Sequence, residues 1–312
     1  MINEIKPGKT SIGYYLAENP EVRTTSGGKQ FLSVTLKDKT GTIEAKKWDL
    51  RPSEIEKYES LKSGTIMQAE VTGEMFKNKI QGRIGKLRIA NHNDEGLYDL
   101  NDLILSAPEE PEKMLEEILN EVRNMTDPDY KRVLIEEIEK YKTVLLTIPA
   151  AKKVHHAYRG GLLHHTVRMM RAAKRIGEVY EVDMDLLLTG TIFHDFMKMK
   201  EMETNHYGVV EEYTTEGSLL GHVVMGVSYI GSLDLPQEKK LILQHIILSH
   251  HGHPEFGSPV CPAVPEAVII HHIDMMDAEI AIMEKEMEKT EPGTMSDRVW
   301  ALDQRKIYHR NV

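Results

Sequence analysis

An adjacent histidine and aspartate, His194 and Asp195, stand inside the apolar stretch TIFHDFMK of residues 191–198. Two neighbouring metal-capable side chains have no evident packing role in such a stretch. Of the 15 histidines in the chain, 13 lie between His155 and His272. Histidine is the commonest metal-ligating side chain, so this concentration predicts a metal site in this part of the chain.

Further candidate ligands occur on both sides of this pair. The whole set is His165, His194, Asp195, His222, His250, His251 and Asp274. Counted from His194, the intervals are 28 residues to His222, 56 to His250 and 80 to the last candidate. Each step is about one helical hairpin long, and the helices of a bundle can direct one ligand each toward a shared cavity. Any one histidine is more simply a buried or surface polar residue, but the set favours a metal site.

Length and composition indicate a globular chain of one large or two ordinary domains, with 312 residues of which 40% are hydrophobic. No apolar run approaches the ~20 residues of a membrane span, and the N-terminal residues lack the apolar core of a signal peptide. The single Cys261 cannot form an internal disulfide. We expect a soluble, cytoplasmic protein that does not bind membranes.

Residues 1–92 and 93–312 carry opposite net charge. The first part has 16 Lys+Arg and 11 Asp+Glu, giving +5, and the second has 23 and 38, giving −15. A basic module could hold a polyanion and clustered carboxylates suit divalent cations, although surface charge also segregates by chance. The acidic segments 109–124 and 280–289 could be interfaces of a homo-oligomer or solvated faces, and the second interpretation is simpler.

The first part of the chain shows short strands separated by turn signals. Residues 31–38, FLSVTLKD, alternate between apolar and other side chains, and Lys39-Thr40-Gly41 then turns into 42–49. Further strands are predicted at 13–23, 65–76 and 79–89, with a polar helix at 52–61. Five strands with a helix between the third and fourth match the OB-fold, whose second and third strands often receive single-stranded nucleic acid. We expect an OB-fold domain over residues 1–92.

The outward face of this predicted barrel carries aromatic and basic side chains. Phe31 and Trp48 offer surfaces for base stacking, which is worth ~1–3 kcal/mol per base. The basic residues that could follow the phosphates are Lys46, Lys79, Arg83, Lys86 and Arg88. Trp48 could equally be a core residue, and each lysine alone is more simply a solubilising charge.

Residues 93–111 are polar, acidic and proline-bearing, which predicts a linker. Apolar residues recur at helical spacing over most of 112–312, so we expect an all-α domain there. Pro149 predicts a helix over 150–158, and a long final helix is predicted over 263–289. The polar residues 201–215 are predicted to form a loop long enough to act as a lid.

The order of the candidate ligands, with Lys198 after His194-Asp195, resembles the HD-domain metal-dependent phosphohydrolases in their two-metal form. Supporting stretches are LLGH at 219–222, LSHHG at 248–252 and HHID at 271–274. With the OB-like domain in front, the chain from Gly13 to about Leu302 resembles the YhaM-like 3′-to-5′ exoribonucleases. The resemblance implies a small all-β OB-fold barrel followed by an all-α HD-domain helical bundle.

The resemblance also implies two metal groups that share one ligand. The first group is His165, His194, Asp195 and Asp274, and the second is Asp195, His222, His250 and His251. Asp195 suits the shared position because a carboxylate can bridge through two oxygens, whereas an imidazole cannot. Mixed imidazole and carboxylate ligation fits Mn, Fe, Co or Zn, and the resemblance favours Mn.

Three further residues are candidates for contact with a phosphate. Lys198 follows His194 by one helical turn, so its ammonium could reach the phosphate being cleaved, although it could also be an ordinary exposed lysine. His156 and Arg159 could contact the phosphate or the leaving group. Met197 stands where the resembled motif HD-x-Gly-Lys has glycine.

We expect a metal-dependent 3′-to-5′ exoribonuclease that hydrolyses single-stranded RNA to nucleoside monophosphates, with Asp195 and Lys198 as catalytic residues. Single-stranded DNA is a further candidate substrate. One alternative is an HD phosphodiesterase acting on a cyclic nucleotide or signalling dinucleotide, although the Gly-Tyr-Pro signature of that branch is missing. Another is a non-catalytic single-stranded nucleic-acid binder, which the complete ligand set disfavours.

Overall fold

The computed structural model describes residues 1–77, 79–152, 156–205 and 208–311. Two of the clustered histidines, His155 and His206, therefore lie outside the described residues, as does Asn78 in a predicted turn. The chain divides into two compact units, Met1–Ser106 and Ala107–Val312. The division lies within the segment 93–111 that is predicted as a linker. Among the described residues, no helix combines the length and apolar character that a bilayer span requires.

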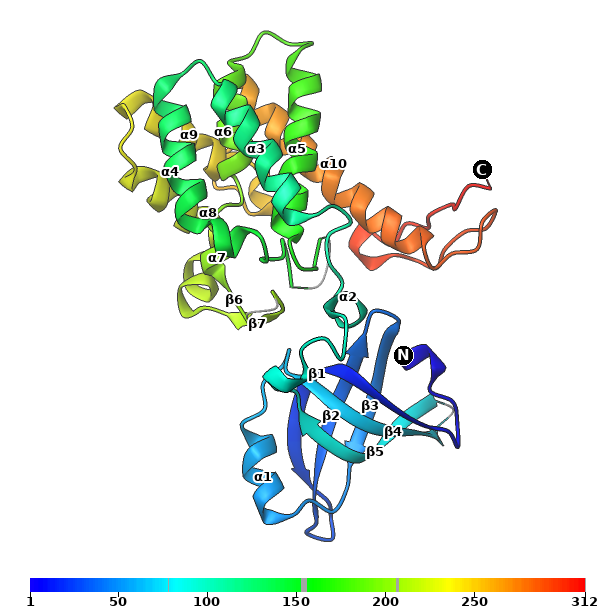
Figure 1. Cartoon of the computed structure of the whole chain (residues 1–312). Coiled ribbons are helices and arrows are strands. Elements are labelled where there is room, and N and C mark those ends of the chain that lie inside the picture. The colour runs from blue at the N-terminus through cyan, green and yellow to red at the C-terminus, as the bar shows by residue number, and fades with distance from the viewer. Residues whose placement is uncertain (78, 153–155, 206–207, 312) are drawn as a thin grey trace. The chain divides into compact units, whose positions relative to one another are not determined.

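The first unit is a closed five-stranded barrel, which confirms the predicted fold class. Its strands are β1 (Thr10–Thr24), β2 (Gln30–Asp38), β3 (Gly41–Lys47), β4 (Ile66–Phe76) and β5 (Lys79–Ile89). They pair in the order β1-β2-β3-β5-β4, and the helix α1 (Pro52–Glu59) connects β3 to β4. The pairing of β3 with β5 is parallel and the others are antiparallel. This strand order with this helix is the OB-fold plan (Figure 1).

The alternation in β2 explains how the barrel core forms. Leu32, Val34 and Leu36 are all buried inside the barrel, while the residues between them face outward. Closure depends on Gly82 in β5, because a Cβ there would lie 2.8 Å from Val71 and 3.1 Å from Ala45. A glycine at this position lets β3 and β5 approach closely enough to pair.

The second unit is built around a helical core. Its helices are α3 (Pro111–Asn124), α4 (Pro128–Leu145), α5 (Gly161–Gly177), α6 (Met184–Phe193), α7 (Lys198–Glu201), α8 (Thr215–Ser232), α9 (Gln237–Ser249) and α10 (Pro265–Met287). Asp127 and Asp183 cap α4 and α6, since each carboxylate accepts at least one backbone N–H of the first turn. Apolar side chains from α3, α4, α5, α6, α8, α9 and α10 share one core.

Two predictions in this unit are wrong. The described residues of 150–158 form a loop instead of a helix, because His156 has a φ of 48° and its carbonyl accepts the N–H of Ala150. A residue in the left-handed region cannot continue a right-handed helix. Residues 201–215, predicted as a loop, contain the paired strands β6 (Met202–Thr204) and β7 (Val210–Tyr213). These strands are too short to show a clear alternating pattern.

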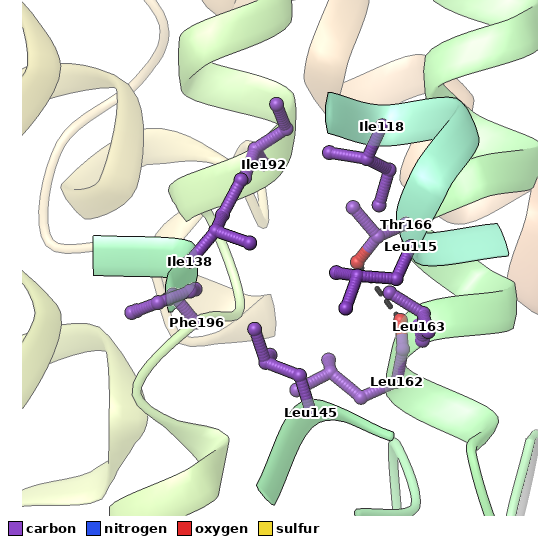
Figure 2. Close-up of a pocket in the computed structure, with 9 residues that line it drawn as sticks. All are labelled: Leu115, Ile118, Ile138, Leu145, Leu162, Leu163, Thr166, Ile192 and Phe196. Atoms are coloured by element: carbon purple, nitrogen blue, oxygen red, sulfur yellow. Dashed lines mark hydrogen bonds between the residues drawn. The ribbon is translucent and has the colours of Figure 1, made fainter. Parts of the chain in front are cut away.

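A small apolar hollow remains between α3, α4, α5 and α6 (Figure 2). The side chains that line it are Leu115, Ile118, Ile138, Leu145, Leu162, Leu163, Thr166, Ile192 and Phe196. The one polar member, Thr166, donates its hydroxyl to the carbonyl of Leu162 at 2.8 Å. The hollow therefore has one polar group, whose proton is already donated, and packing around it depends on the apolar side chains.

We expect Ile138→Ala to destabilise the helical unit by ~2–5 kcal/mol, because Ile138 is buried and truncation would enlarge the existing hollow. Urea unfolding of the full chain, followed by the far-ultraviolet circular dichroism of the helices, measures this loss. Ile135→Ala removes the same atoms from a half-exposed position on the same helix and should cost about 0.5 kcal/mol or less. Equal losses in the two variants would contradict this account of the core.

Candidate metal centre

The pair His194 and Asp195 lies in the turn between α6 and α7, and both side chains are buried. The sequence of α6 is apolar on all sides, as expected for a helix enclosed by others. Close packing depends on Gly190, because a Cβ there would lie 2.8 Å from Ile270 in α10 and 3.0 Å from Ile246 in α9. This contact brings α9 and α10, which carry other candidate ligands, toward the turn.

The remaining candidate ligands come from separate elements, and the structure brings all of them together. His165 lies in α5, His222 in α8 and Asp274 in α10, while His250 and His251 directly follow α9. Ligand atoms of three residues lie within 4.8 Å of one another in each of two groups. One group is His165, His194 and Asp274, and the other is His222, His250 and His251.

Asp195 lies between the two groups and turns one oxygen toward each. Its Oδ2 is 3.4 Å from Nε2 of His194 and 3.8 Å from Nε2 of His165. Its Oδ1 is 3.3 Å from Nε2 of His222 and 3.8 Å from Nε2 of His250. This is the arrangement that a carboxylate shared between two metal ions requires, and it matches the predicted division of ligands.

Several atoms of the second group are buried without a partner. Among the described residues, the buried side-chain atoms that lack a hydrogen bond include Asp195 Oδ1, His222 Nε2, His250 Nε2 and His251 Nδ1. An unpaired buried polar atom costs about 1–3 kcal/mol, so four in one place need a common explanation. All four are metal-ligand atoms, and one divalent cation would satisfy them together. The residues present therefore fit a divalent ion.

Backbone carbonyls fix the ring orientation of two candidate ligands, His194 and His250. Nδ1 of His194 donates to the carbonyl of Thr191 and Nδ1 of His250 to that of Ile247, each at 2.7 Å. A carbonyl can only accept, so the proton is on Nδ1 and the Nε2 lone pair faces the centre. Burial lowers the pKa of His250 well below its ordinary value and also lowers the pKa of His251, which keeps both rings neutral and able to ligate.

His165 is held from behind by a carboxylate, Asp277. Its Oδ2 accepts hydrogen bonds from Nδ1 of His165 at 2.8 Å and Nε2 of His156 at 2.7 Å. Burial opposes the charge of Asp277, but hydrogen bonds from His156 and His165 hold its pKa well below the ordinary range. Arg168 adds an ion pair to Oδ1 at 2.6 Å.

This network corrects the prediction that His156 contacts a phosphate. His156 is buried, and its two ring nitrogens are bonded to Asp277 and to the hydroxyl of Tyr158, the latter at 2.6 Å. Neither nitrogen is left to meet a substrate. Arg159 differs, because this half-buried residue has no ion pair or side-chain hydrogen bond in the part of the chain that the structure describes. Arg159 therefore stays a candidate for anion contact.

Lys198 lies within the centre and pairs with Oδ2 of Asp195 at 2.6 Å. Burial disfavours charge on both groups, but Lys198 and His194 hold the pKa of Asp195 well below its ordinary value. Asp195 in turn raises the pKa of Lys198, so both groups are ionised. Met197, which replaces the glycine of the resembled motif, is buried in the apolar core.

Sequence reasoning gave no role to Asp277, nor to Glu201, which accepts a hydrogen bond from His222. The sequence does contain a pattern that could have indicated Asp277, because Asp274 and Asp277 are three residues apart and therefore share one face of α10. No such pattern indicates Glu201.

The first unit presents an aromatic surface on β2, β3 and the end of β4. The rings of Phe31 and Trp48 stack at 4.5 Å between centroids, and Trp48 is 42% exposed. Lys46 Nζ lies 5.7 Å from the ring centroids of both Trp48 and Phe76. Trp48 is therefore not a core residue, and the half-exposed Phe76 extends the surface that the sequence predicted.

The other basic candidates of the first unit differ in whether their charge is already paired. Lys79 and Lys86 are exposed, whereas Arg83 pairs with Glu74 at 2.9 Å on the neighbouring strand. Arg88 donates to Asp94 at 2.7 Å and to Gln68 at 2.9 Å. The guanidinium of Arg88 thus holds its own domain together, which argues against the predicted phosphate contact.

The family comparisons agree with the geometry of the centre. Residues 162–279 match the family model of the HD domain, and this range contains every candidate ligand. This part of the helical unit is therefore similar to the HD domain, a match that supports a phosphohydrolase that depends on a divalent metal. A second family model, TraI_2, whose description names a helicase, matches residues 101–186.

Solved structures with similarity to this chain include domains of replication protein A. One is a domain of replication protein A from Methanococcus maripaludis, with 19% identity over 28% of this chain and 90% of that chain and a TM-score of 0.23. Another is a replication protein A heterotrimer bound to ssDNA, with 18% identity over 30% of this chain and 67% of that chain and a TM-score of 0.23.

We expect Asp195→Asn to lower the metal content of both groups, because an amide cannot offer a charged oxygen to each side. Elemental analysis after loading with Mn and gel filtration measures this content. His272→Ala, which removes an exposed histidine from the same helix as Asp274, is the control and should retain the wild-type content. An unchanged metal content in Asp195→Asn would contradict the shared position of this carboxylate.

Proposed function

We propose that this protein is a metal-dependent 3′-to-5′ exoribonuclease, similar to the YhaM-like enzymes, that hydrolyses single-stranded RNA to nucleoside monophosphates. The observation that carries the proposal is the position of Asp195, with one oxygen toward each of two ligand groups. Two-metal sites occur in phosphatases and nucleases, where the two ions can stabilise both the attacking and the leaving oxygen.

The chain would hold one ion with His165, His194, Asp195 and Asp274, and a second with Asp195, His222, His250 and His251. Two divalent ions, for which the resemblance favours Mn over Fe, Co or Zn, would supply Lewis acidity toward the phosphodiester. The rings of His165, His194 and His250 would hold the ions in fixed positions, because the Nδ1 atom of each ring is already hydrogen-bonded to the protein.

Two cations of the chain would bind the phosphate. Lys198 is charged and lies against Asp195, and we assign its ammonium to a non-bridging oxygen of a phosphate in the centre. Arg159 is half-buried without an ionic partner among the described residues, and its planar guanidinium suits bidentate contact with a phosphate. We assign these contacts to Lys198 and Arg159, and leave out His156.

The first unit would bind the nucleic-acid strand. Phe31 lies on β2 and Trp48 directly follows β3, the two strands that often receive single-stranded nucleic acid in OB-folds, and Lys46 adds a positive charge beside their stacked rings. Lys79 and Lys86 are exposed cations of the same unit. Stacking does not distinguish RNA from DNA, so the resemblance alone supports RNA as the preferred substrate.

The direction and product of hydrolysis can be tested with RNA labelled at either end. With Mn, we expect RNA labelled at the 5′ end to shorten stepwise, and RNA labelled at the 3′ end to release labelled mononucleotide at once. Asp195→Ala should lose both activities. Cleavage of cyclic nucleotides or dinucleotides alone would support the phosphodiesterase alternative, and binding without cleavage would support a non-catalytic binder.

We expect Trp48→Ala to raise the KM for long single-stranded RNA about 5- to 150-fold, the equivalent of ~1–3 kcal/mol of lost stacking. The rate on a small phosphodiester should not change, because that substrate needs no strand binding. Trp300→Ala removes an exposed tryptophan from the second unit and serves as the matched control. A Trp48→Ala variant with an unaltered KM would contradict the assignment of strand binding to the barrel.

A further inference from the structure

Helix α8 is broken one residue before the candidate ligand His222. Gly221 has φ 69° and ψ 159°, which no residue of an α-helix adopts. In a continuous helix, the N–H of His222 would donate to the carbonyl of Ser218, four residues earlier. The break releases this N–H, and Oε1 of Glu201 accepts it at 3.0 Å.

The same oxygen also holds the ring of His222. Oε1 of Glu201 accepts from Nδ1 of His222 at 3.1 Å, so one carboxylate oxygen binds both the backbone and the side chain of this residue. With its proton on Nδ1, the ring turns the lone pair of Nε2 toward Oδ1 of Asp195, 3.3 Å away. Nε2 of His222 is one of the buried atoms without a hydrogen-bond partner.

Glu201 is itself held in place by the surrounding backbone. Its carbonyl accepts the N–H of Thr214 at 2.9 Å. Gly217 approaches the same carbonyl so closely that a Cβ there would lie 2.3 Å from the oxygen. The Glu201 side chain is only 13% exposed, so it has little freedom to turn away from His222.

We propose that Glu201 is a positioning residue for His222, and that the break at Gly221 exists to let one carboxylate oxygen hold both the backbone and the ring of this ligand. The inference rests on the proposed metal centre and gives a role to two residues outside the ligand set. Carboxylates behind a ligating histidine raise its basicity and fix its orientation.

The test is a calorimetric titration of the full chain with Mn. Glu201→Ala should weaken Mn binding about 10- to 100-fold. Glu201→Gln should weaken it less, because an amide oxygen can still accept both hydrogen bonds. Gly221→Ala should also weaken binding, because alanine is strained at the positive φ of this position. A steric clash would not be the cause, since a Cβ at 221 would meet nothing closer than a Glu201 oxygen at 3.8 Å.

A double-mutant cycle separates positioning from a general structural role. If Glu201 acts through His222, Glu201→Ala should cause little further loss of affinity in the His222→Ala background. Glu203→Ala, at an exposed position two residues further on, is the matched control and should bind Mn like the wild type. Thermal unfolding confirms that each variant is folded.

Three outcomes would overturn the inference. A Glu201→Ala variant that binds Mn with wild-type affinity would exclude the positioning role. If Glu201→Ala lowers the Mn affinity as much in the His222→Ala background as in the wild type, Glu201 does not act through His222. In both cases a wild-type protein that binds Mn and shortens RNA would leave the proposed function intact. A wild-type protein that binds no Mn would overturn the metal centre and this inference together.

Discussion

The arrangement of the helical unit depends on one buried carboxylate. Asp195 is 3% exposed and ionised, so its charge must be balanced inside the protein. Lys198 supplies one cation, and the two groups of imidazoles face its two oxygens. Because those imidazoles come from different helices, the packing of α5, α6, α8, α9 and α10 is what holds the centre together, and the close approach at Gly190 is part of it.

The two units depart from ordinary burial in opposite directions. The barrel exposes the aromatic rings of Trp48 and Phe76 beside a lysine, whereas the helical unit buries histidines and carboxylates. Both arrangements cost stability unless a ligand covers the rings or satisfies the buried groups. Exposed aromatic side chains and buried polar groups are common at functional sites. Here they indicate a binding surface on the barrel and a metal centre inside the helical unit.

The sequence alone predicted the barrel, and it singled out the candidate ligands that the structure brings together, because both follow from local patterns. Strand alternation in β2 and the spacing of His194, His222 and His250 need no knowledge of the fold. The helix predicted over 150–158 failed because His156 has a left-handed backbone, and its buried ring bonds Asp277, which lies 121 residues away in the sequence. Glu201 could not be assigned a role, since its partner His222 lies 21 residues away. The spacing of Asp277 from Asp274 indicates a shared helix face, but not its partner His165, which lies 112 residues away.

The most direct measurement of the central claim is a crystal structure of the protein soaked with Mn, with anomalous scattering recorded near the Mn absorption edge. The account predicts two peaks, one beside Oδ1 and one beside Oδ2 of Asp195. The first peak would lie among His222, His250 and His251, and the second among His165, His194 and Asp274. A single peak, or peaks remote from Asp195, would contradict the claim that this carboxylate is shared between two metal ions.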